Sequence, residues 1–277
     1  MSPISSMDAL WAASILARIL TRSQGTDYGG YYSYQFQGVY FLSLIAIVAA
    51  TTAFLLWHSI RSAPGRSIAL ITGFLILLCQ GLLGYAGWPE SAVRFEGLPL
   101  AVMSMVAPFT LAGLMLALVF GPGDRLHINL SALAAIQTFR IFIEGFLFMS
   151  LYEQEGIPRE MTILGRNPDI LVGITAPVVA LLHWRGHLSP GWLLLWNLMG
   201  LGCLLNIVIV AILSMPTGFQ IFGIGQPNVA VLRFPFMLLP AFLVPLAFLS
   251  HLYSVWMLSR AALLKAREPS PAPGRGS

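Results

Sequence analysis

Charged residues are scarce in this sequence. Asp, Glu, Lys and Arg make up 9% of the 277 residues, whereas soluble domains carry about 25%. This shortage excludes an ordinary cytosolic domain and a disordered chain, and no nucleic-acid partner is expected because the net charge of +4 forms no basic patch. Hydrophobic residues make up 57% of the chain. The composition is typical of a multi-pass α-helical membrane protein, whose first partner is the lipid bilayer.

Patterns that carry catalytic or metal chemistry are also lacking. The sequence has no HExxH or GxSxG motif, no histidine triad and no carboxylate-rich phosphate–metal motif. Its two cysteines, Cys79 and Cys203, form no CxxC pair, so a thiolate metal site is excluded. The single lysine, Lys265, follows the last apolar run, which excludes a retinal Schiff base within a span. No cofactor and no metal site are predicted.

Long apolar runs, by contrast, are abundant. A membrane-spanning helix needs about 20 residues, and seven runs reach or approach that length: 38–58, 67–87, 98–120, 129–151, 168–184, 190–213 and 234–258. We predict an all-α, seven-transmembrane-helix bundle over residues 37–260. The fifth run is the shortest, which suggests a helix that begins below the membrane interface.

Shorter segments are expected to flank this bundle. Residues 1–36 are predicted to form an N-terminal interfacial segment, with a helix over 9–20 that is too short to span and is not preceded by the basic residues of a cleaved signal. Residues 261–277, rich in Pro, Gly and Ser near their end, are predicted to be a disordered basic tail.

The distribution of cations between the connections predicts the orientation. Cytoplasmic loops carry an excess of Lys and Arg. One side of the predicted bundle holds Arg61, Arg66, Arg125, Arg185, Arg260, Lys265, Arg267 and Arg275, and the other holds Arg18, Arg22, Arg94, Arg159, Arg166 and Arg233. The larger set favours an N-terminus outside and a C-terminus in the cytoplasm.

Three polar residues in the fourth run form one stripe. Gln137, Arg140 and Glu144 are spaced so that they share a face of an α-helix. Charges inside a bilayer cost a few kcal/mol each, so we expect Arg140 and Glu144 to face the bundle interior and to contact one another or polar groups of neighbouring spans. His251 in the seventh run lies at a depth that matches Gln137 and is predicted to join this layer. The layer is interpreted either as a clamp between helices or as a site for a ligand or proton.

A second set of candidate residues lies in the outward-facing connections. The first connection contributes Glu153, Arg166, Asn167 and Asp169, although Asn167 and Asp169 also fit the start of a helix. Residues 214–233 carry no charge before Arg233 and contain three glycines and two prolines. We predict that this segment packs over the outer mouth of the bundle, near Arg166 and Asp169, with Gln226 and Asn228 as its polar tips.

Several segments resemble a family of short, uncharacterised bacterial integral membrane proteins. The similar segments are RIFIEGFLF, GIPREMTILGRNPDILVGITAP, PTGFQIF, QPNVAV and PFMLLPAFLVPLAFLSHL, within residues 140–252. The resemblance implies a bacterial inner (plasma) membrane location but no activity. Where the family reads Phe-Glu before Gly-Arg-Asn, this chain has Ile163 and Leu164, so a role for that glutamate does not carry over.

Three functions are left open by the sequence. The first is a protein that binds or moves a small ligand or a proton through the polar layer. The second is a structural or assembly subunit that associates with other membrane subunits. The third is a membrane-embedded enzyme acting on a lipid or prenyl substrate, with Glu144 or His251 as its acid or base.

Overall fold

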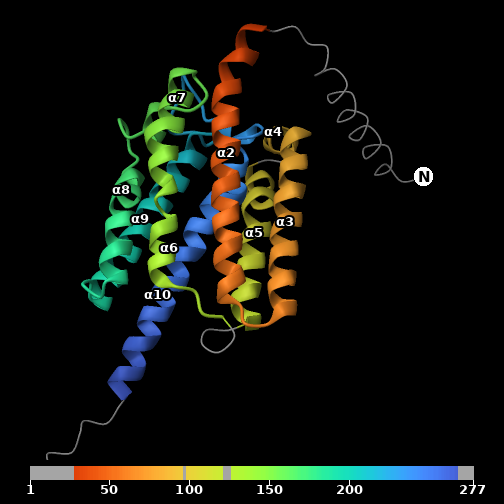
Figure 1. The fold of residues 1–277 in the computed structure, drawn as a ribbon. Coiled ribbons are helices and arrows are strands. Elements are labelled where there is room, and N and C mark those ends of the chain that lie inside the picture. The colour runs from red at the N-terminus through yellow and green to blue at the C-terminus, as the bar shows by residue number, and fades with distance from the viewer. Residues whose placement is uncertain (1–27, 96–97, 121–125, 268–277) are drawn as a thin grey trace, which may run out of the picture.

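The computed structural model describes residues 28–95, 98–120 and 126–267, and these residues form a bundle of helices (Figure 1). Its first long helices are α2 (Tyr28–Ser59), α3 (Ala63–Tyr85) and α5 (Leu98–Phe120), with the short α4 (Trp88–Phe95) between α3 and α5. The predicted helix over residues 9–20 lies outside the described residues. The N-terminal boundary at residue 36 falls inside α2, which already begins at Tyr28.

The second part of the chain contains interrupted helices. The fourth predicted run folds as α6 (Leu130–Ile136), the π-helix η1 (Ile141–Leu147) and α7 (Phe148–Glu153). The 3-10 helix η2 (Arg159–Met161) precedes α8 (Asp169–Trp184), and α9 (Pro190–Leu213) follows. After the 3-10 helix η3 (Ala230–Leu232), the last predicted run folds as the π-helix η4 (Leu239–Leu243) and α10 (Val244–Arg267).

Six helices of the described residues are long and apolar enough to cross a membrane, rather than the predicted seven. The fifth run forms α8, a helix of 16 residues, which is short for a bilayer core of about 30 Å. One end of α8 lies beside the start of α6, where His183 Nδ1 and Ser131 Oγ are 2.7 Å apart. Residues 154–168, which include η2, lead from the end of α7 to the start of α8 inside the bundle.

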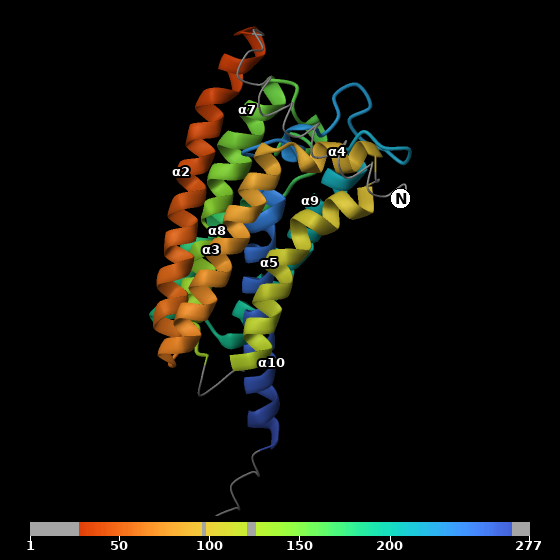
Figure 2. The ribbon, with the colours of Figure 1, turned by 90° about the vertical axis from the view of Figure 1, so that its right-hand side faces the viewer.

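The ends of the described chain lie at opposite ends of the bundle (Figure 1). Helix α10 extends past the other helices and continues to Arg267, beyond the predicted boundary at residue 260. Residues 268–277 lie outside the described residues. Figure 2 shows α5 bent along its length, and Pro108 inside this helix supplies the physical cause, because proline removes one helical hydrogen bond.

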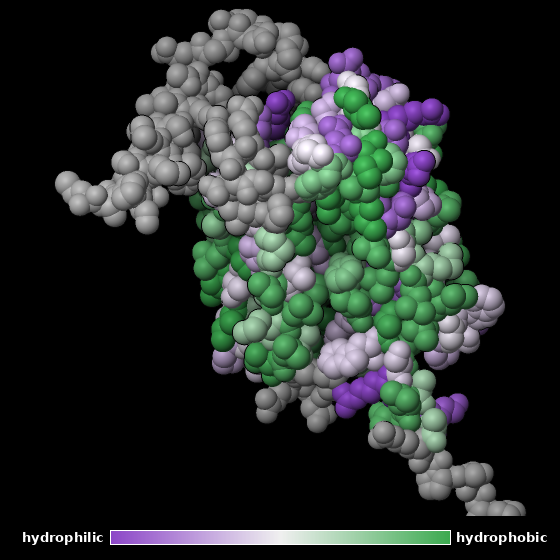
Figure 3. Space-filling view, turned by 180° about the vertical axis from the view of Figure 1, so that it is seen from behind, coloured by the Kyte–Doolittle hydropathy of each residue, from purple (hydrophilic) through white to green (hydrophobic). Residues whose placement is uncertain are grey.

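The surface is mostly apolar around the middle of the bundle, and polar residues gather toward its ends (Figure 3). The largest group of buried apolar side chains lies between α2, the α6–η1–α7 stretch, α9 and the η4–α10 stretch. Helix α10 packs against α9, α5 and α6, while α8 packs against α6 and α9. This arrangement surrounds the polar residues of η1, α8 and α10 with protein on most sides.

Candidate functional site

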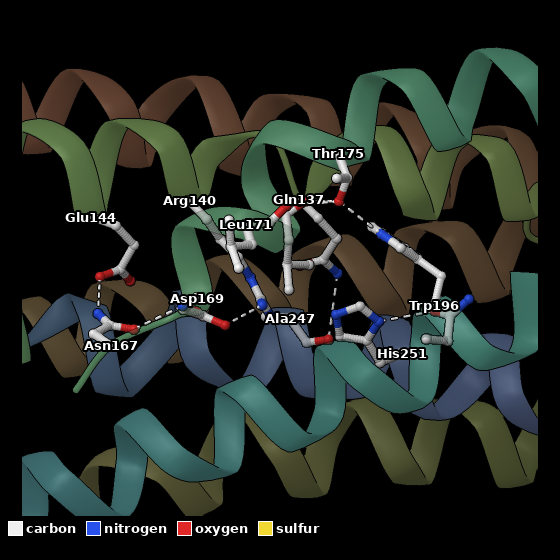
Figure 4. A network of polar contacts seen from close by, with 12 residues as sticks. Gln137, Arg140, Glu144, Asn167, Asp169, Leu171, Thr175, Trp196, Ala247 and His251 are labelled. Carbon is white, nitrogen blue, oxygen red and sulfur yellow. Dashed lines mark hydrogen bonds and ion pairs between the residues drawn. The ribbon is translucent and has the colours of Figure 1, made fainter. Parts of the chain in front are cut away.

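A cluster of polar side chains lies inside the bundle between the α6–η1 junction, α8, α9 and α10 (Figure 4). At its centre Arg140 Nη1 donates to Asp169 Oδ1 over 2.6 Å, and the two side chains are 1% and 4% exposed. Asp169 is the first residue of α8, where the positive end of the helix dipole favours a carboxylate. The start of α8 inside the bundle therefore supplies the counter-charge that makes a buried arginine tolerable.

Asn167 links the two carboxylates of the cluster. Its Nδ2 donates to Glu144 Oε2 and, over 2.9 Å, to the carbonyl oxygen of Met161. Its Oδ1 accepts the backbone N–H of Asp169 at 3.0 Å. Asn167 thus holds Glu144 and also fixes the backbone at the start of α8, which positions Asp169 for Arg140.

Arg140 and Glu144 are both buried in the interior, as predicted, but the prediction that they pair with one another is wrong. Arg140 pairs with Asp169, and Glu144 accepts from Asn167. The expected pairing assumed a regular α-helix, whereas η1 begins directly after Arg140 and has the wider turn of a π-helix. The second predicted alternative, contact with polar groups of neighbouring segments, holds for both residues.

His251 forms the other end of the cluster. Its Nδ1 lies 2.9 Å from Asn197 Oδ1, and Asn197 Nδ2 donates to the carbonyl oxygen of Leu193. Because the asparagine oxygen is the acceptor, His251 Nδ1 carries the proton, and the neutral ring therefore presents Nε2 as an acceptor. The imidazole also lies 5.5 Å from the ring of Trp196, centroid to centroid.

Gln137 lies at the level of the helical turn that precedes His251. Its Nε2 donates to the carbonyl oxygen of Ala247 over 3.5 Å, and Ala247 lies one turn before His251 on α10. The predicted match in depth between Gln137 and His251 is therefore confirmed.

Two residues of this region were not selected from the sequence. The run 190–213 contains two asparagines, Asn197 and Asn206, which lie on opposite faces of a helix. Nothing in the sequence pattern indicated which of them would contact His251. Gly200 packs against the imidazole, and a Cβ atom there would lie 2.4 Å from His251 Cε1. Gly200 gives no recognisable signal in the sequence, because only the helix packing reveals the close approach.

The candidates in the connections divide into two groups. Asn167 and Asp169 belong to the buried cluster, whereas Glu153 is exposed at the end of α7. Arg166 is exposed and its guanidinium carbon lies 4.9 Å from the ring centroid of Phe222. The predicted common site at the outer mouth is therefore not formed as one group.

Gln226 and Asn228 hold the segment 214–233 against the bundle. Gln226 Nε2 donates to the carbonyl oxygens of Tyr152 and Ile157 over 2.8 and 2.7 Å, and Asn228 Nδ2 donates to that of Ala211. The segment packs on the end of α7 and reaches Arg166 through Phe222, as predicted, although Ile224 at its tip is 82% exposed. The side-chain amides of Gln226 and Asn228 donate to backbone carbonyl oxygens, so both residues have a structural role.

No metal site accompanies the cluster in the residues that the structure describes. No group of three or more His, Cys, Asp or Glu side chains there is arranged to hold a metal ion. A groove of about 360 Å³ lies on α3 and shares no residue with the cluster; it is lined by Phe74, Leu77, Leu78, Gly81, Leu82, Tyr85 and Phe234. Its apolar lining suits a lipid chain rather than polar chemistry.

Comparison with known proteins identifies a family. A domain of unknown function (DUF8737) matches residues 97–259, more than half of the chain. The chain belongs to this family. No curated protein and no solved structure matches it. The DUF8737 region contains every residue of the buried cluster, whereas α2, α3 and α4 lie before it.

Proposed function

We propose that this DUF8737 protein is a multi-pass protein of the bacterial inner membrane that binds and releases a proton, or a small ligand together with a proton, at the buried polar cluster. One observation carries this proposal. Glu144 is buried among the helices, and within the described part of the chain it has no ion pair, because the guanidinium of Arg140 is engaged by Asp169.

The charge balance of the cluster supports a role in proton binding. Arg140 and Asp169 compensate each other, so an ionised Glu144 leaves one uncompensated negative charge in apolar surroundings, which is costly. A proton on Glu144 removes that charge. Asp169 also lies close enough to Glu144 to disfavour its ionised form, while Arg140 and the hydrogen bond from Asn167 oppose this effect and burial outweighs them.

The orientation is part of the proposal. The excess of Lys and Arg beyond the lower end of the bundle in Figure 1 favours that end, where α10 extends outward, as the cytoplasmic one. With the N-terminus outside, residues 154–168 would lie toward the periplasm and provide the route to Glu144. A reporter fused after Arg267 should be active in the cytoplasm, and activity restricted to the periplasm would contradict this orientation.

Infrared spectroscopy of the protein in liposomes tests the proton site. Glu144→Gln keeps an oxygen that can accept from Asn167, so the fold should persist while the carboxyl group disappears. We expect a protonated-carboxyl band that changes with pH in the wild type and is absent from this variant. Glu153→Gln, which removes an exposed carboxyl on α7, is the matched control and should leave the band unchanged. Identical carboxyl bands in the wild type and Glu144→Gln would reject the proposal.

A structural subunit is the second candidate. Helices α2, α3 and α5 expose wide apolar faces, which lipid or the helices of another subunit can cover. Purification in a mild detergent should then recover a fixed partner in a constant ratio. Recovery of the chain alone, with an intact fold, would remove this candidate.

A further inference from the structure

The guanidinium of Arg140 uses only part of its hydrogen-bonding capacity. Nη1 donates to Asp169, but Nε and Nη2 have no partner although the side chain is fully enclosed. Nε and Nη2 lie along the same edge of the planar group, so their N–H bonds point in the same direction. This edge has the geometry that binds the two oxygens of a carboxylate simultaneously.

Two further buried atoms beside Arg140 lack partners. They are Oε1 of Gln137, one turn earlier in the chain, and Nε2 of His251. Figure 4 shows Gln137 and His251 on the side of Arg140 that faces away from Glu144. Buried polar atoms normally have hydrogen-bond partners, so unpartnered atoms of three neighbouring side chains from two separate parts of the chain indicate a binding site for a small polar group.

The fixed orientation of His251 strengthens this assignment. Asn197 holds Nδ1, and the ring lies so close to Gly200 that a Cβ atom there would be 2.4 Å from His251 Cε1. Nε2 is consequently kept as the free nitrogen. It can accept a hydrogen bond from a ligand, or donate one to a carboxylate oxygen when the ring is protonated.

We propose that the Nε–Nη2 edge of Arg140 binds the carboxylate of a small organic acid, with the acceptor atoms Gln137 Oε1 and His251 Nε2 placed beside it for a hydroxyl or amine hydrogen of the same ligand. This inference rests on the proposed proton site. A carboxylate adds one negative charge to the cluster, and uptake of one proton by Glu144 keeps the net charge unchanged. The ligand and the proton therefore bind together, and no covalent bond is formed or broken.

The charge requirement is tested with pairs of small molecules of equal shape. Formate, acetate and benzoate are compared with formamide, acetamide and benzamide, using thermal unfolding and isothermal titration of the purified full-length chain in detergent. At least one carboxylate should bind and stabilise the wild type while its amide does not, and the size series reports the space available. Equal effects of each acid and its amide would overturn the inference.

The arginine edge is tested by a substitution that preserves charge. Arg140→Lys keeps a cation for Asp169 but removes the paired donors, so carboxylate binding should weaken by about tenfold or more. Arg166→Lys changes an exposed arginine outside the cluster and should bind as the wild type does. If Arg140→Lys does not fold, Gln137→Glu replaces it, because the new carboxylate would occupy the free edge and compete with the ligand. Wild-type affinity in either folded variant would overturn the inference.

Proton uptake separates this inference from the proposed function. Titrations in two buffers with different ionisation enthalpies give the number of protons taken up per carboxylate. At a pH above the titration of Glu144, where its carboxyl group is ionised before the ligand binds, the wild type should take up about one, and Glu144→Gln should bind without uptake. Carboxylate binding without proton uptake in the wild type would support the site and reject the role of Glu144. A titrating Glu144 band without any carboxylate binding would support the proton site and reject the ligand.

Discussion

The α2, α3 and α5 helices and the α6–α10 part of the chain have similar hydropathy but very different burial. In the apolar window of α5 only 6% of the residues are buried inside the chain, whereas the window within Leu239–Ala266 reaches 61%. The first group therefore presents most of its surface outward, and the second forms the interior. Hydropathy alone places both in a membrane and does not tell them apart.

Their polar residues differ in the same way. In α2 the hydroxyls of Thr51 and Thr52 donate to carbonyls four residues earlier in the same helix, so they need no hydrogen-bond partner on a neighbouring helix. In the second group Arg140 and His251 bind residues from other parts of the chain. The first group also has contacts between segments: Gln80 donates to the carbonyl of Ser104, and Gln37 and Tyr40 of α2 donate to the hydroxyl of Ser150 and to the carbonyl of Phe142. Polar groups that cross between segments fix the relative positions of α6, α8, α9 and α10, which lie in the DUF8737 region apart from the end of α10 after residue 259.

The largest expected effect comes from breaking the central ion pair. Asp169→Ala leaves Arg140 buried without a counter-charge and should lower the free energy of unfolding by about 3–5 kcal/mol. Leu118→Ala in α5, at a side chain that is 79% exposed, should change it by less than about 0.5 kcal/mol. Unfolding in detergent by heat or denaturant measures both.

The double variant Arg140→Met with Asp169→Leu distinguishes the stability lost with the ion pair from the stability lost with side-chain packing. It should recover most of the stability lost in Asp169→Ala, because a buried ion pair often exchanges for apolar side chains at little cost. If Asp169→Ala were as stable as Leu118→Ala, Arg140 would have another partner and the contrast between the two parts of the molecule would fail.

Much of this architecture could be predicted from hydropathy and charge. Six of the seven predicted runs correspond to helices of spanning length, and the shortness of the run at 168–184 already indicated a helix that begins below the interface. The burial of Arg140 and Glu144 follows from the cost of exposing charge to lipid.

The pairing within the cluster could not be predicted in this way. It depends on the π-helical turn after Arg140 and on the depth at which residues 154–168 deliver Asp169, and both are set by packing between distant segments. Asn167 and Asp169 satisfied the rules for a helix start, which gave no indication that the start lay inside the bundle.

A smaller effect is expected at the contact between α9 and His251. Gly200→Ala places a methyl group against the imidazole and should cost about 1–3 kcal/mol. Gly202→Ala is the matched control, since a Cβ at Gly202 meets nothing within 4 Å, and it should be neutral or stabilising by up to about 1 kcal/mol. Comparison of the two unfolding transitions reports whether His251 is held as tightly as its contacts indicate. Equal stability of both variants would mean that the ring moves aside.

The smallest effect on stability is expected for Glu144→Gln. This variant tests whether the side chain of Glu144 fixes helix positions, as that of Asp169 does, or contributes little to them, as the threonine hydroxyls of α2 do. The variant has nearly the same shape, and its side-chain oxygen can still accept from Asn167. Since Arg140 remains paired with Asp169, the free energy of unfolding should change by less than about 0.5 kcal/mol. Thr52→Val in α2, where the lost hydroxyl served only its own helix, should give a change of similar size.

A loss in Glu144→Gln comparable to that in Asp169→Ala would instead show that an ionised Glu144 shares Arg140. In that case both carboxylates would fix the helix positions, and the proton would have to bind elsewhere in the cluster, with His251 as the remaining titratable group.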